Sequence, residues 1–262
     1  MIICDMEEKI EMGRRENRGF RAALISGKGV ALMRHPAIFL SLAVPVFAQA
    51  PAIDLFNGKD LDGWRFPKGT WSAVESVKID PANPKDFIAK PGKGVMLNSA
   101  GEHTVDALTE REFGDCKLHV EFCVPKGSNS GIYLMGRYEV QILDSYGKEK
   151  VTFGDCGGIY ERSTGGGGRA PDVNASKPAG EWQTFEINFR APQFDASGKK
   201  TANAKFIEVK LNDKVVQTNV EVEGPTRSAK FNDENSKGPL MLQGDHGPVA
   251  FRNLLIEEVT RP

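Results

Sequence analysis

Short segments in which apolar and polar residues alternate recur along residues 51–262, and none of the longer stretches has the 3.6-residue spacing of an amphipathic helix. Glycine, proline, asparagine and aspartate separate these segments, as they do in turns. The expected strands are Trp71–Ile79, Phe87–Leu97, Lys117–Val124, Gly131–Met135, Tyr138–Leu143, Trp182–Arg190, Lys205–Leu211, Lys214–Val220, Leu240–Leu242 and Val249–Val259. Many short strands without helices predict an all-β fold, a sandwich or jelly roll of two antiparallel sheets.

The first 50 residues have a different character. A basic stretch, Met33-Arg34-His35-Pro36, precedes the apolar run 37–47, and Ala48-Gln49-Ala50 follows it. This is the layout of a secretory signal peptide over residues 33–50, with an A-x-A cleavage site. Residues 1–32 are then an extension that is either disordered or the product of a wrongly assigned start codon.

Cleavage would leave residues 51–262 as one domain in a secreted or periplasmic protein. The apolar run is shorter than the ~20 residues of a membrane-spanning helix, so we expect no stable membrane span after cleavage. The remaining chain has 27 Lys and Arg against 30 Asp and Glu, without a basic patch, which argues against a nucleic-acid partner. The oligomeric state cannot be predicted from these features.

Three cysteines, Cys116, Cys123 and Cys156, follow the predicted cleavage site. An odd number in an exported protein leaves at least one unpaired thiol. Cys116 and Cys123 lie seven residues apart on one predicted strand and therefore face opposite sides, so they cannot pair with each other. Cys156 could pair with either.

Two consecutive predicted strands that meet at Gly136 carry the most unusual polar side chains. Glu139 and Gln141 alternate with apolar residues and would share one face of their strand. Arg137 and Tyr133 are close by in the sequence. Because polar side chains are costly inside a sheet sandwich, the group predicts the floor of a polar cleft for a hydroxylated ligand.

Other candidate site residues come from three places. Asp144 ends the second of these strands, and Tyr160 and Glu161 follow a pair of glycines. His246 lies between glycines shortly after Gln243, where an imidazole could act as a general base or as a metal ligand. Each group could also be purely structural, as a solvated strand face, a bulge or a turn.

Five blocks of sequence together resemble the 3-keto-disaccharide hydrolase domain family, formerly DUF1080. In order, they are Leu55-Phe56-Asn57-Gly58-Lys59-Asp60-Leu61-Asp62-Gly63-Trp64, Ser128-Asn129-Ser130-Gly131-Ile132-Tyr133-Leu134, Tyr138-Glu139-Val140-Gln141-Ile142-Leu143-Asp144, Glu181-Trp182-Gln183-Thr184 and His246-Gly247-Pro248-Val249-Ala250-Phe251-Arg252-Asn253. The resemblance extends over about residues 52–260. It implies a concanavalin A-like lectin/glucanase jelly roll, export and a small carbohydrate substrate.

The family's activity is the cleavage of glycosides that already carry a ketone at C3. Such a ketone acidifies C2–H, so a base can remove that proton and the enolate can expel the anomeric substituent, after which water adds. This chemistry makes Glu139 or His246 the expected base or metal ligand, and the two side chains could together hold a divalent metal ion as cofactor. Arg137, Gln141 and Gln243 would hold sugar hydroxyls or the enolate oxygen, and Tyr133, Asp144, Tyr160 and Glu161 would line the site.

Three other functions fit the same fold. A carbohydrate-binding module would bind glycans without turnover, and an adhesion domain of the cell envelope would lack a polar cleft. A conventional retaining glucanase of this fold uses a Glu-x-Asp-x-(x)-Glu strand, but here Gln141 stands where the assisting aspartate would be. Glu139 and Asp144 are five residues apart and would face opposite sides of a regular strand, which argues against the glucanase.

Overall fold

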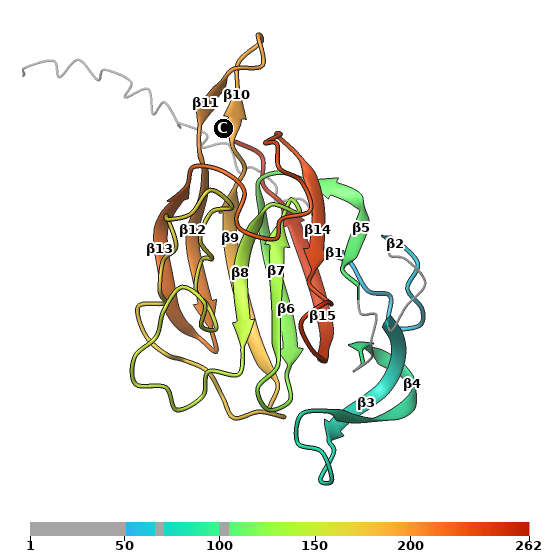
Figure 1. Cartoon of the computed structure of the whole chain (residues 1–262). Coiled ribbons are helices and arrows are strands. Elements are labelled where there is room, and N and C mark those ends of the chain that lie inside the picture. The colour runs from blue at the N-terminus through green and yellow to red at the C-terminus, as the bar shows by residue number, and fades with distance from the viewer. Residues whose placement is uncertain (1–50, 66–70, 100–104, 262) are drawn as a thin grey trace, which may run out of the picture. The chain divides into compact units, whose positions relative to one another are not determined.

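The computed structural model describes residues 51–65, 71–99 and 105–261, which form fifteen β-strands and no helix (Figure 1). The predicted extension 1–32 and the predicted signal peptide 33–50 lie outside the described residues. The strands are β1 (Ile53–Asp54), β2 (Trp64–Arg65), β3 (Trp71–Ile79), β4 (Phe87–Asn98), β5 (Ala107–Phe113), β6 (Cys116–Cys123), β7 (Asn129–Leu134), β8 (Tyr138–Leu143), β9 (Gln183–Arg190), β10 (Gln193–Phe194), β11 (Lys200–Ala202), β12 (Ala204–Leu211), β13 (Lys214–Val222), β14 (Gly238–Leu242) and β15 (Val249–Glu258).

Two antiparallel sheets make up the sandwich. The larger sheet has eight strands in the order β13-β12-β9-β6-β15-β4-β3, with β1 paired to β15. The smaller has five strands in the order β2-β5-β14-β7-β8. Strands β10 and β11 form a separate hairpin that projects beyond the sheets at the top of Figure 1. The order of both sheets is non-consecutive, as expected for a jelly roll, so the predicted all-β sandwich is confirmed.

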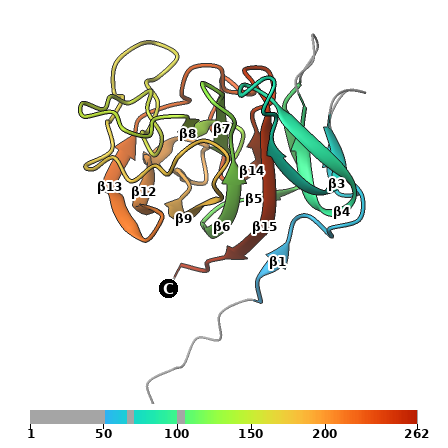
Figure 2. The same cartoon turned by 90° about the horizontal axis from the view of Figure 1, so that it is seen from below.

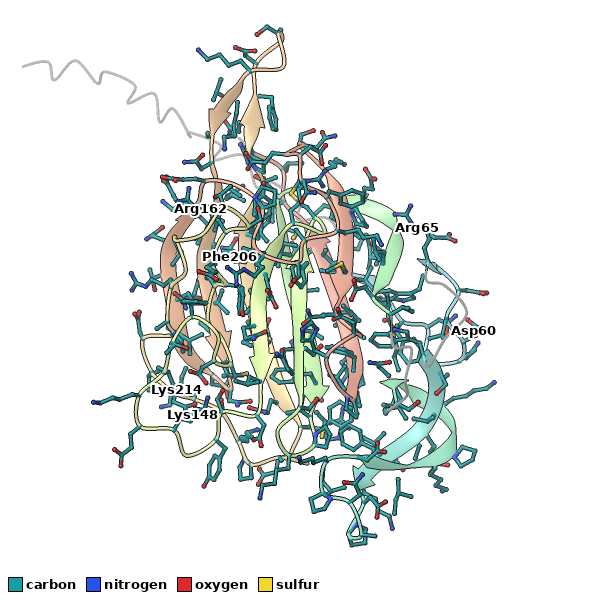
Figure 3. All side chains as sticks on the ribbon, viewed as in Figure 1. Asp60, Arg65, Lys148, Arg162, Phe206 and Lys214 are labelled. Carbon is teal, nitrogen blue, oxygen red and sulfur yellow. The ribbon has the colours of Figure 1, made fainter. Side chains whose placement is uncertain are left out.

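The core lies between the inner faces of the two sheets, which Figure 2 shows face to face. Aromatic rings join the layers: Tyr138 of β8 packs on Phe189 of β9, with ring centroids 5.5 Å apart. Phe189 in turn packs on Phe206 of β12, which is labelled in Figure 3. Because the alternation along β8 directs Tyr138, Val140 and Ile142 into this core, its other side chains must face outward.

All ten predicted strands are present, with boundaries that differ by no more than three residues. The sequence-based prediction missed β5, whose Thr-Glu-Arg-Glu stretch lacks the alternation of a half-buried strand, and the short strands β1, β2, β10 and β11. The predicted hairpin turn at Asn212-Asp213 is confirmed, and both residues have the positive φ of a type I′ turn.

The three thiols are unpaired and buried. Cys116 packs in the main core and Cys123 in a smaller cluster, in agreement with the prediction that they face opposite sides of β6. Burial raises the pKa of each thiol to about 12, so none is a reactive thiolate at neutral pH. Within the described ranges, no helix is long and apolar enough to cross a membrane.

Candidate active site

A pocket of about 120 Å³ opens on the outer face of the five-stranded sheet, and β7 and β8 form its floor. Tyr133 pairs with Glu139 and Gly131 with Gln141 across these strands, so all four share this face. The lining residues are Asn129, Tyr133, Glu139, Gln141, Tyr160, Arg227, Ser228, Gln243 and His246. The structure thus brings together six residues expected from the sequence: Tyr133, Glu139, Gln141, Tyr160, Gln243 and His246.

The absence of a side chain at Gly131 creates the space that the Glu139 carboxylate occupies. A Cβ atom at Gly131 would lie 2.3 Å from Glu139 Oε1 and 3.0 Å from its Cδ. Since no two such atoms can approach so closely, an alanine here would displace the carboxylate. Gly131 is therefore part of the site although it offers no functional group.

Glu139 is a buried carboxylate without a basic partner among the described residues. Its side chain is almost fully enclosed, with 2% of the residue exposed. Burial raises the pKa of Glu139 to about 8, and the charges of Asp245 and Asp106 add to the rise, while a hydrogen bond with Tyr133 acts in the opposite direction. A carboxyl group with this pKa exchanges a proton near neutral pH, as a general base must.

Three amide oxygens of the pocket lack hydrogen-bond partners: Asn129 Oδ1, Gln141 Oε1 and Gln243 Oε1. The orientation of the Gln141 amide is determined, because its Nε2 donates to the carbonyl oxygen of Gly154 at 3.2 Å. A buried acceptor without a partner costs about 1–3 kcal/mol. Ligand hydroxyl groups would remove this cost by donating to the three oxygens.

Two segments distant in the sequence form walls around this floor. Next to β8, the backbone of Tyr160 donates to Glu139 O at 3.3 Å, and the Tyr160 ring is in edge contact with Phe153. The other wall contains Arg227 and Ser228. The Tyr133 hydroxyl donates to the carbonyl oxygen of Arg227 at 3.2 Å, which links this wall to the floor.

His246 reaches the pocket from the loop that follows β14. A Cβ atom at Gly244, two residues earlier, would lie 2.1 Å from Val105 O. Only glycine therefore allows the loop to pass this close to the segment that contains Val105. His246 Nδ1 lies 2.5 Å from Asp245 Oδ1, and 46% of its side chain is exposed. The carboxylate orients the ring and leaves Nε2 available to a ligand.

Three residues that the sequence suggested for the site lie outside the pocket lining. The Arg137 guanidinium donates to Met135 O, Asp233 O and Asp233 Oδ1, and it stacks on the ring of Phe231. Asp144 accepts a hydrogen bond from the backbone of Gly127, at the far end of β8. Glu161 forms an ion pair with Arg227 at 2.7 Å and is not among the lining residues.

Asn129, Arg227 and Ser228 are pocket residues that the sequence analysis did not propose. Asn129 lies in one of the family-like blocks and on the same strand face as Tyr133, so the alternation could have identified it. Arg227 and Ser228 lie in a polar connection between β13 and β14, and nothing in its local pattern indicates a contact with β7 and β8.

The described part of the chain contains no group of three or more His, Cys, Asp or Glu side chains that could hold a metal ion. Glu139 and His246 contribute one carboxylate and one imidazole nitrogen to the pocket. A divalent ion held by this pair stays a prediction.

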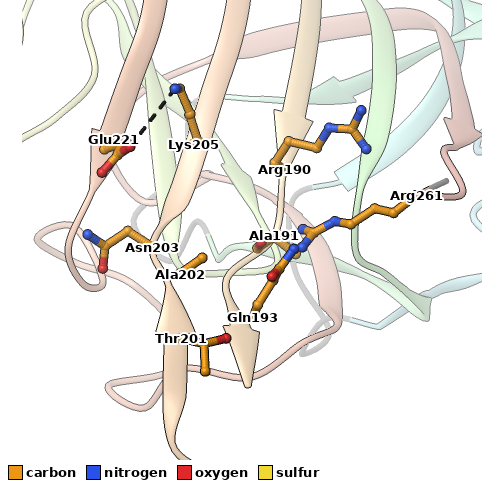
Figure 4. A pocket seen from close by; sticks show the side chains of 9 residues that line it. All are labelled: Arg190, Ala191, Gln193, Thr201, Ala202, Asn203, Lys205, Glu221 and Arg261. Atoms are coloured by element: carbon orange, nitrogen blue, oxygen red, sulfur yellow. Dashed lines mark hydrogen bonds and ion pairs between the residues drawn. The ribbon is translucent and has the colours of Figure 1, made fainter. Parts of the chain in front are cut away.

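A larger hollow of about 690 Å³ lies elsewhere, next to the β10–β11 hairpin (Figure 4). Arg190 and Arg261 on its wall are both paired with Asp115, and Lys205 lies 3.9 Å from Glu221. None of its described lining residues is a buried polar group without a partner. The smaller pocket therefore remains the candidate active site.

Comparison with known proteins assigns the family. The model of the 3-keto-alpha-glucoside-1,2-lyase-like domain matches residues 51–257. The chain belongs to this family. No curated protein matches the chain significantly.

Solved structures agree with this assignment. A crystal structure from Parabacteroides distasonis, described as a candidate glycosyl hydrolase, is 31% identical, with a TM-score of 0.60, and the match covers 80% of this chain and 86% of that chain. A second such structure from the same organism is 20% identical with a TM-score of 0.54, covers 80% of this chain and 100% of that one, and supports the fold alone. This family member is a carbohydrate-active, glycosyl-hydrolase-like domain with the predicted jelly roll.

Proposed function

We propose that this protein cleaves 3-keto-glycosides, with Glu139 as the base that removes the C2 proton. The main support is Glu139 itself: a buried carboxylate with a pKa near 8, in a pocket that offers free acceptors to sugar hydroxyls. A carboxylate with a high pKa is a stronger base than an exposed one, and it suits the weakly acidic C–H beside a ketone. The family match to a 1,2-lyase-like domain supports the same chemistry.

The proposed reaction has three steps. Glu139 takes the proton from C2, and the electron pair of that bond forms an enolate with its charge on the C3 oxygen. The ketone then re-forms as the C1–O bond breaks, leaving a C1–C2 double bond, and the departing oxygen takes a proton. His246, whose ring is oriented by Asp245, is the proposed donor of that proton. Addition of water at C1 completes net hydrolysis.

The amide groups of Asn129, Gln141 and Gln243 would hold the sugar ring, since their carbonyl oxygens lack other partners. The Tyr133 hydroxyl stays protonated, because burial and the nearby Glu139 charge raise its pKa. It therefore adds no second negative charge beside the Glu139 carboxylate. No step of this mechanism depends on a metal ion.

The test uses a 3-keto-glucoside and the matching unoxidised glucoside, with aglycone release as the readout, in the presence and absence of EDTA. We expect release from the keto-sugar alone, and a loss of about 10²–10⁴-fold in Glu139→Gln, the usual contribution of a general base. Glu121→Gln, the same substitution outside the pocket, is the control. A loss of activity in EDTA would indicate that the predicted metal ion takes part in the reaction.

Two results would contradict the proposal. Full activity in both Glu139→Gln and His246→Ala would remove these residues from the mechanism. Binding of the keto-sugar without release by the unmodified protein would instead indicate a carbohydrate-binding module.

A further inference from the structure

The wall segment from Thr226 to Lys230 is attached to the hairpin that carries the proposed base. Thr226 N and Oγ1 both donate to Arg137 O, at 2.8 and 2.9 Å. Thr226 Oγ1 also accepts from Glu139 N at 3.2 Å, and Lys230 N donates to Gly136 O at 2.9 Å. The position of the wall is thus coupled by hydrogen bonds to the backbone of Glu139.

Arg227 is held at both its backbone and its side chain. Its N–H donates to Glu161 O at 2.8 Å, and its Nη2 lies 2.7 Å from Glu161 Oε1. The next residue, Ser228, has φ of +62°, a conformation that non-glycine residues seldom adopt and that is enriched at functional sites. Both residues line the pocket, so this turn with positive φ forms part of the wall around the ligand space.

The charges around the base create a need that Arg227 can meet. The two ionised side chains that act on Glu139, Asp245 and Asp106, are both acidic. An enolate forming beside them would be destabilised unless a cation faced it. Of the described lining residues, only Arg227 and His246 can be positive. The His246 ring is engaged by Asp245, whereas a guanidinium is always charged.

We propose that Arg227 is a catalytic residue whose guanidinium binds the C3 oxygen of the substrate and stabilises the enolate formed there. This rests on the proposed function. When Glu139 accepts the C2 proton, the electron pair moves into the C2–C3 bond and the carbonyl pair moves onto the oxygen that Arg227 contacts. The guanidinium donates hydrogen bonds and transfers no proton, so it leaves each turnover unchanged.

Glu161 is the positioning residue in this arrangement. One carboxylate occupies part of the five-donor guanidinium and leaves the other N–H groups for the substrate. Arg227 pairs with Glu161 and not with Glu139. The base and the cation can therefore act on adjacent atoms of one ligand without neutralising each other.

The test isolates enolisation from bond cleavage by using 1,5-anhydroglucitol oxidised at C3, which has no leaving group at C1. In D₂O, exchange of its C2 hydrogen, followed by proton NMR at saturating ligand, requires a base and enolate stabilisation only. We expect Arg227→Met to slow this exchange about 10²–10³-fold, as the loss of an oxyanion-stabilising donor does. Arg227→Lys keeps the positive charge but not the planar guanidinium, so its exchange rate should lie between those of Arg227→Met and the unmodified protein.

Arg169→Met is the matched control, because Arg169 forms an ion pair with Asp172 outside the pocket and its side chain is about as exposed as that of Arg227, 50% against 56%. It should exchange at the rate of the unmodified protein. Unfolding midpoints of the Arg227 variants should stay close to that of the unmodified protein, since exposed ion pairs stabilise proteins by at most about 1 kcal/mol.

The outcomes separate the two proposals. If Arg227→Met exchanges at the normal rate at saturation while Glu139→Gln does not exchange, the role of Arg227 is refuted and the proposed function stands. If Arg227→Met only weakens binding of the ligand, Arg227 positions the sugar and the inference is wrong. Normal exchange in Glu139→Gln would refute the proposed function itself.

Discussion

Replacement of Glu139 by glutamine should make the protein more stable at alkaline pH while it removes activity. Glu139 is enclosed, and burial raises its pKa to about 8, whereas the same group ionises near 4.5 when exposed. Between these values the folded state holds one proton more than the unfolded state. Stability therefore decreases as the pH rises through this window, by about 1.4 kcal/mol per pH unit.

The full difference between pKa values of about 8 and 4.5 corresponds to about 5 kcal/mol above pH 8. This is an upper limit, because water that enters the pocket would solvate the carboxylate. Glutamine is nearly isosteric with glutamate and does not ionise, so Glu139→Gln should lack this pH dependence. The two proteins should have similar stability near pH 4.5 and diverge up to about pH 8.

Urea unfolding at pH 5, 7 and 9 measures the effect directly. Glu121→Gln is a control, because its expected effect on stability has the opposite sign to that of Glu139→Gln. Burial raises the pKa of Glu121, but hydrogen bonds from Asn253 and Arg252 outweigh this effect and hold it below its usual value, so its loss should destabilise the protein at neutral pH. Parallel pH dependences for Glu139→Gln and the unmodified protein would refute the conclusion that Glu139 is buried without a compensating cation.

The remaining predictions concern the site and the N-terminus. Gly131→Ala should reduce kcat at least 10²-fold, because it displaces the Glu139 carboxylate. Gly224→Ala should leave kcat unchanged, because a Cβ atom there meets no atom within 4 Å. A kcat unaffected by Gly131→Ala would contradict the placement of the base. The rate of C2 hydrogen exchange in the 3-keto ligand without a leaving group should rise with pH to a plateau above about 8, where Glu139 is ionised; a flat profile from pH 6 to 9 would exclude it as the base. Mass spectrometry of the exported protein should find residue 51 at its N-terminus, and an intact residue 33–50 segment would contradict the signal peptide.

The strands and the choice of face could be predicted because both depend on local patterns. Alternation with a period of two placed Glu139 and Gln141 on one face of β8 and Tyr138 on the other, as the structure confirms. The same rule assigned Cys116 and Cys123 to opposite faces of β6. It failed for β5, where exposed charged residues hide the alternation.

Arg137 shows where proximity in sequence misleads. It is two residues from Glu139 and was expected in the cleft, but the turn between β7 and β8 directs its side chain to Asp233 and Phe231. Arg227 is 94 residues from Tyr133, yet the two are joined by a hydrogen bond at the pocket. Such a contact depends on how the connection after β13 folds over the sheet, and no local pattern encodes it.

The all-β sandwich, the family and the strand face that carries Glu139 could all be predicted before folding was considered, because alternation and motif order are properties of neighbouring residues. The tertiary structure alone decided that this carboxylate is desolvated, that three amide oxygens remain without partners and that Arg227 joins them. The physical reason is that desolvation is collective: the pKa of Glu139 depends on walls contributed by segments far apart along the chain, and only the folded chain removes water from it.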